Sequence, residues 1–164
     1  MAFNHIDLIG GQAFATTETT QSHQLGMVVR GFDSTFGVGE FIYLKGVAST
    51  AVGSIVSYNT STFTTVLCPV GNNRSRPVAF AMSANVANQF GWYQIGGVAV
   101  ARKTCTICLV TSGVVGVLTI GLVAGSGSGK ELRGAIVAAT ASAAAGRTTV
   151  QLTVNRPHMQ GRVT

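Results

Sequence analysis

The run FGWYQIGGVAVARK, residues 90–103, decides the fold class of this chain. Successive side chains of an extended strand point to opposite faces of the sheet. Two sets are therefore expected on opposite faces: Trp92, Gln94 and Gly96, and Tyr93, Ile95 and Gly97. A glycine pair inside a strand marks a β-bulge or a sharp bend. The run predicts a strand that bends at its two central glycines before VAVAR resumes.

Strand-type runs precede this segment. VGEFIYLKG (38–46) alternates, so Phe41 and Tyr43 should share one face while Ile42 and Leu44 share the other. VGSIVSY and TFTTVLC follow, and the polar link NTS between them is typical of a β-hairpin. PVAFAM also alternates, after the arginine-containing loop GNNRSRP.

Further strand-type runs follow it: TCTICLVT, VGVLTIGLV, LRGAIVAA and RTTVQLTV. The last should direct Val150, Leu152 and Val154 inward, and NRPH should then end it. Short strands spaced about 8–12 residues apart, with turn signals between them, indicate a barrel or a sandwich. The sequence therefore predicts an all-β fold, a small β-barrel or sandwich over residues 26–164, with a flexible loop near 125–131.

Residues 1–25 predict an extended N-terminal arm, because the stretch AFATTETTQSHQ is small and polar with no sustained period. Such an arm could bind a neighbouring subunit and hold two subunits together. Deleting it is then expected to weaken assembly while the β-core stays folded.

The chain contains few charged residues and few side chains of the types that form active sites. Asp, Glu, Lys and Arg make up 10% of the residues, against about 25% in ordinary soluble domains. Residues 1–40 sum to −3, whereas residues 41–164 sum to +9. A basic body suits either a solvated surface or contact with an acidic surface or nucleic acid. Five acidic residues and three scattered histidines favour a structural protein over an enzyme.

Three local patterns suggest other functions, and each has a simpler explanation. Residues 104–129 carry no charge, but their β-branched residues and glycines favour two buried strands over a membrane helix. GSGSGKE lacks the first glycine and the final hydroxyl of a phosphate-binding loop. Cys105 and Cys108 have metal-ligand spacing, but with Cys68 they are expected to be reduced, buried small residues in a cytosolic setting. No metal and no cofactor is predicted.

The runs FIYLKGVASTAVGSIVSYN, RPVAFAMSANVANQFGWYQIGG and VQLTVNRP resemble the small capsid decoration (cement) proteins of tailed bacteriophages. The resemblance covers roughly residues 38–158. It is carried by the central motif Gly91, Trp92, Tyr93, Gln94, Ile95 and Gly97. It implies a β-tulip-like form of the fold.

The resemblance implies a non-enzymatic protein on the capsid exterior, made in the host cytoplasm, that stiffens the shell as trimers. Its partners would be the major capsid protein and copies of itself, with no membrane and no specific nucleic acid. The candidate contact residues are Phe3, Ile6, Leu8, Arg74, Arg76, Trp92, Tyr93, Arg102 and Lys103. A tail or fibre-base subunit and, less favoured, a nucleic-acid-binding β-barrel are the alternatives, and an enzyme ranks last.

Overall fold

In the computed structural model every regular element of the described residues is a strand, so the prediction of an all-β fold is confirmed. The structure describes residues 3–7, 12–70, 75–104, 114–125, 129–138 and 148–160. The strands are β1 (Asn4–His5), β2 (Thr17–Glu18), β3 (Val28–Asp33), β4 (Gly37–Lys45), β5 (Ile55–Tyr58), β6 (Thr65–Leu67), β7 (Val78–Ala81), β8 (Phe90–Arg102), β9 (Val114–Thr119), β10 (Leu122–Gly125), β11 (Glu131–Val137) and β12 (Thr149–Met159). The finer assignment to a barrel, a sandwich or a β-tulip stays a prediction.

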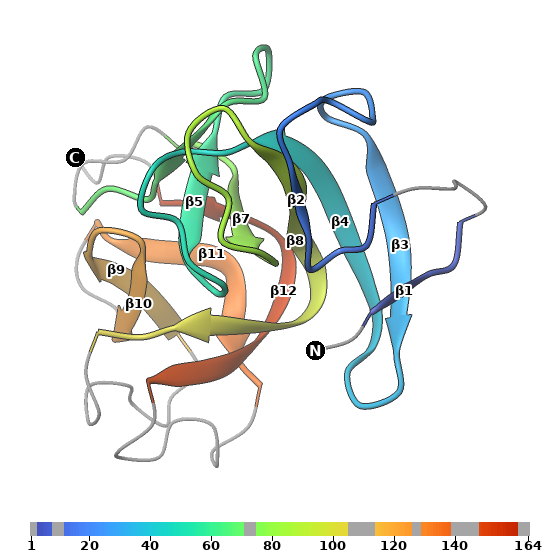
Figure 1. The fold of residues 1–164 in the computed structure, drawn as a ribbon. Helices are drawn as coiled ribbons and strands as arrows, with labels where there is room; N and C mark the ends of the chain where they lie inside the picture. The colour runs from blue at the N-terminus through green and yellow to red at the C-terminus, as the bar shows by residue number, and fades with distance from the viewer. Residues whose placement is uncertain are drawn as a thin grey trace.

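The strand β8 organises the sheet. The main path of paired strands is β1-β3-β4-β8-β12-β11-β9-β10, and all the strand pairs are antiparallel. β2 and β7 also pair with β8, and β7 pairs in turn with β5. In Figure 1, β8 runs between β1, β3 and β4 on one side of the molecule and β9, β10 and β11 on the other. The residues just beyond β8 also contact β10 at the end of this path, since the Thr104 N–H donates to Val123 O (2.9 Å).

The predicted bulge in β8 is confirmed. β8 advances from Gln94 to Gly96 where β4 advances by a single residue, so the register shifts there. Gly97 follows with a φ of +87°, and a Cβ at this position would lie 2.4 Å from Val38 O. Both observations require glycine, because a side chain disfavours positive φ and has no room here.

The second half of β4 and the first half of β8 are buried on both faces, and their side chains are divided between the faces as the alternation of their sequences predicts. Phe41, Tyr43 and Trp92 pack in one hydrophobic cluster, with Phe3, Phe14, Val29 and Met82. The opposite face holds a second cluster, Ile42, Leu44, Val56, Ala79, Ala81, Tyr93 and Ile95. The third and largest cluster joins the second half of β8 to β5, β7, β9, β10, β11 and β12.

The predicted hairpin between residues 52 and 68 is confirmed, since Val56 pairs with Leu67 and Tyr58 with Thr65. The run VGVLTIGLV, expected as one strand, is instead a hairpin. β9 and β10 are separated by a turn at Ile120 and Gly121, which has a φ of +72°. Because Gly121 readily takes a positive φ, the chain reverses inside an otherwise continuous apolar run.

The prediction that NRPH ends the last strand is wrong. β12 continues through Pro157 to the buried Met159. A bulge makes this possible: the register with β11 shifts between Arg133 and Ala135, and Arg156 adopts a φ of +41°. Pro157 thus lies at an irregular part of the ladder, where a missing N–H is tolerated.

The N-terminal segment lies on the sheet of its own chain. The described part of residues 1–25 contains β1, which pairs with β3, and β2, which pairs with β8 (Figure 1). Phe3 and Phe14 are buried in the cluster around Trp92. The expectation that the β-core folds without these residues therefore has no support in this packing. Contact of the segment with a neighbouring subunit stays a prediction.

Candidate interaction surface and pocket

Trp92 closes a hydrophobic contact between the N-terminal segment and the central strand. Its Nε1–H donates to Gln12 O at 3.1 Å, and its ring lies edge-on to Phe14 with centroids 5.6 Å apart. Phe14 in turn packs on Phe41 (4.0 Å) and on the His5 ring (4.0 Å). The Gln12 side chain donates to Thr16 O and Phe90 O, which fixes the segment further.

The predicted contact residues do not form one site. Trp92 and Tyr93 are fully buried and lie in clusters on opposite faces of the sheet. Phe3 is buried beside Phe41, with ring centroids 5.0 Å apart. The motif that carries the resemblance therefore builds the core of this chain. Burial raises the pKa of the Tyr93 hydroxyl.

The other predicted contact residues are dispersed. Lys103 is buried next to Val123 at the far end of β8, where Arg102 is exposed. Ile6 is exposed beside β3, where its N–H donates to Arg30 O (3.1 Å). Leu8 and Arg74 lie outside the described residues, as do Cys105 and Cys108 and residues 126–128 of the predicted flexible loop.

Among the described residues, exposed apolar side chains lie on one face of β3, at the start of β4 and just after β1. These side chains are Ile6, Val28, Phe32 and Val38, which are 46%, 44%, 48% and 54% exposed. The alternation of VVRGFD in β3 already places Val28, Arg30 and Phe32 on one face. Only the packing shows which face is uncovered, and for that reason Val28, Phe32 and Val38 were missed among the candidate residues. We call this surface the β1–β3–β4 face.

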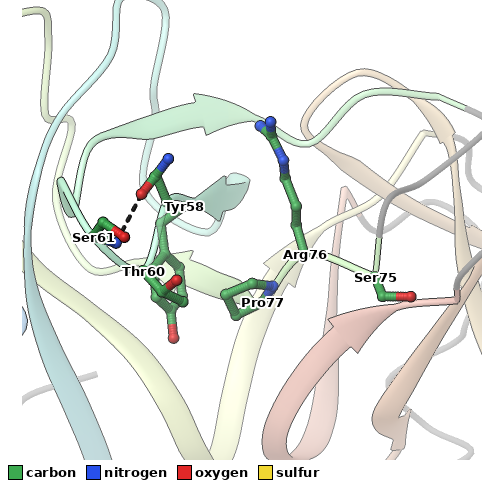
Figure 2. A pocket seen from close by; sticks show the side chains of 7 residues that line it. Tyr58, Thr60, Ser61, Ser75, Arg76 and Pro77 are labelled. Atoms are coloured by element: carbon green, nitrogen blue, oxygen red, sulfur yellow. Dashed lines mark hydrogen bonds between the residues drawn. The ribbon is translucent and has the colours of Figure 1, made fainter.

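A pocket of about 380 Å³ opens beside the β5–β6 turn. Its lining residues are Tyr58, Asn59, Thr60, Ser61, Ser75, Arg76 and Pro77 (Figure 2). Asn59 is held in the turn, because its Oδ1 accepts from the Ser61 N–H at 2.7 Å. In Figure 2 the Arg76 side chain and the Tyr58 hydroxyl point in opposite directions, so the two do not converge on one ligand atom.

Two observations on the described residues concern metal ligands and the thiol of Cys68. Among these residues, no group of three or more His, Cys, Asp or Glu side chains lies together to hold a metal ion. Cys68 is buried, and its thiol donates to Met159 Sδ at 3.3 Å. Burial raises the pKa of this thiol to about 12, which removes the thiolate that nucleophilic chemistry needs. No helix in the described ranges is long and apolar enough to cross a bilayer.

Comparison with known proteins gives no relative: no family model, no curated protein and no solved structure matches the chain.

Proposed function

We propose that this chain is a non-enzymatic structural protein of a virus particle. Specifically, it is a decoration (cement) protein that binds the outer surface of a tailed-phage capsid and stabilises the shell. The observation that carries the proposal is the β1–β3–β4 face, where four large apolar side chains are about half exposed. Large apolar side chains exposed on one face of a sheet suit a surface that other protein chains cover in an assembly, copies of the same chain included.

Three further features support this proposal. The pocket at the β5–β6 turn has no carboxylate or histidine among the described residues that line it, so nothing there can serve as a strong general base beside a nucleophile. The motif around Trp92 specifies a buried core. The resemblance to the decoration proteins therefore rests on residues that determine the fold, and that family has no catalytic residue to carry over. The excess of basic residues in 41–164 suits an acidic shell exterior.

The test is the copy number of this protein in purified virus particles, measured against the major shell protein by quantitative mass spectrometry. A ratio near one copy per shell subunit is expected. Antibody labelling on the outer surface of intact particles is expected as well. A few copies per particle would place the protein in the tail or fibre base instead. Complete absence from particles would overturn the proposal.

A second arm of the experiment uses shells that lack the protein. Adding it back is expected to raise the temperature at which the shells release their DNA, because a protein that binds only the assembled form stabilises that form. The resemblance implies trimers, and the stoichiometry on these shells tests that implication. Binding that leaves the release temperature unchanged would contradict the stabilising role.

A further inference from the structure

The β1–β3–β4 face carries a row of charges as well as apolar side chains. Asp7 Oδ1 lies 3.4 Å from Arg30 Nη2, and Glu40 Oε2 lies 3.3 Å from Arg156 Nε. Arg30 and Glu40 are direct cross-strand partners in the β3–β4 ladder. The row therefore crosses the sheet in the order Asp7, Arg30, Glu40, Arg156, with alternating negative and positive charge.

A backbone hydrogen bond holds the Asp7 end of this row, and the position of Gly96 leaves room at the other. The Arg30 N–H donates to Asp7 Oδ2 at 2.7 Å, and this hydrogen bond lowers the pKa of the Asp7 carboxyl. At the other end Glu40 extends over Gly96 of β8, where an added Cβ would lie 3.1 Å from the Glu40 Cβ. Glycine at position 96 thus leaves the space through which Glu40 reaches Arg156.

We propose that the β1–β3–β4 face is a two-fold contact between two copies of this chain. The row has no net charge, although the chain as a whole carries +6, so neither a strongly acidic nor a strongly basic partner is complementary to it. A second copy is complementary. Two such faces can pack against each other about a two-fold axis that is parallel to the strands and passes between Arg30 and Glu40. This axis reverses the order of the row in the second copy, so Arg30 faces the Glu40 of that copy and Asp7 faces its Arg156.

The same axis also matches the apolar side chains. It leaves positions along the strands unchanged and exchanges β3 with β4, so Phe32 faces Val38 of the second copy and Val38 faces its Phe32. These two residues are cross-strand partners within one chain, and they would form a four-residue apolar cluster at one end of the contact. A two-fold axis along the row would instead set like charges against each other, which is unfavourable. The contact is therefore isologous, with each patch binding its own copy.

The experiment measures self-association of the full chain by sedimentation equilibrium at low salt, without any virus particle. The wild-type chain is expected to form dimers. Arg30→Glu and Glu40→Arg are each expected to weaken dimerisation by about tenfold or more, because the symmetry gives each variant two like-charge contacts. An equimolar mixture of the two variants is expected to recover dimers, since all contacts between the two different chains are then of opposite sign.

Two further variants separate the contact from effects on the monomer. Phe32→Ala is expected to weaken dimerisation, while Val52→Ala, an exposed apolar residue outside these strands, is expected to leave it unchanged. A monomeric wild-type chain, a trimer without dimers, or a mixture that stays monomeric would each overturn the two-fold contact. Loss of shell binding by Phe32→Ala with unchanged self-association would assign the face to the shell protein and also overturn it.

This inference does not rest on the proposed function. A chain that dimerises as described but is absent from virus particles would leave the contact standing and remove the decoration role. If the chain is abundant on particles but the charge variants leave its self-association unchanged, the two-fold contact is removed and the decoration role stands.

Discussion

Replacing Phe14 with alanine tests whether the N-terminal segment belongs to the core of its own chain. The Phe14 side chain is 2% exposed and contacts the rings of His5, Phe41 and Trp92. Truncation of a buried phenylalanine to alanine costs about 3–5 kcal/mol. That is a large part of the roughly 5–15 kcal/mol by which native domains are stable.

Urea unfolding measures this cost. Trp92 is the single tryptophan of the chain and packs on Phe14, so its fluorescence reports on this part of the core. With an m-value of about 2 kcal/mol per molar urea, the midpoint of Phe14→Ala should fall by about 1.5–2.5 M. Val52→Ala, at an exposed position, is the control and should change stability by less than about 0.5 kcal/mol.

A loss of less than about 1 kcal/mol for Phe14→Ala would refute the reasoning. It would mean that the segment is not held on its own sheet in solution, and that Gln12 O is not the regular partner of the Trp92 indole. The original expectation of a separate arm, dispensable for the fold, would then be restored.

Three further outcomes are expected. Gly97→Ala should destabilise the chain by about 3 kcal/mol in the same urea assay, because it adds a Cβ 2.4 Å from Val38 O at a φ of +87°. Gly37→Ala is the control: its φ is also positive but the space around it is open, so it should cost only about 1 kcal/mol. Cys68 should resist iodoacetamide at pH 8 in the folded chain and react in urea, as read by peptide mass mapping. Because burial raises the pKa of this thiol from its ordinary value of 9.0 to about 12, its contribution to stability is present below pH 9 and is lost as the pH rises toward 12. Shell binding should weaken when NaCl is raised from about 0.05 M to about 0.5 M, since attraction between a basic chain and an acidic exterior is screened; salt-independent binding in a pull-down assay would contradict that attraction.

The sequence predicted much of the local structure. Period-two alternation separated Phe41 and Tyr43 from Ile42 and Leu44, and the structure buries the two sets in different clusters. The glycine pair predicted the bulge in β8. These features follow from the geometry of one strand, in which alternate side chains must face opposite sides and glycine alone accepts certain backbone angles.

Breaks within strand-type runs were harder to predict. The turn at Gly121 lies in a run that reads as one apolar strand, and β12 passes through Pro157 where the sequence suggests an end. The pairing of β9 with β10 requires the turn at Gly121, and a bulge lets β12 continue past Pro157. The register of β11 against β12, for example, supplies the irregular position that accepts the proline.

What the sequence by itself determined is therefore the strand content, the division of the β4 and β8 side chains between two faces, and the small number of charged residues. Only the tertiary structure decided that Trp92 and Tyr93 are buried core residues, that Phe3 and Phe14 complete the core, and that the Ile6 and Phe32 side of β1 and β3 stays uncovered. The physical reason is that alternation assigns side chains to two faces, but contacts between residues far apart in the chain determine which face is covered.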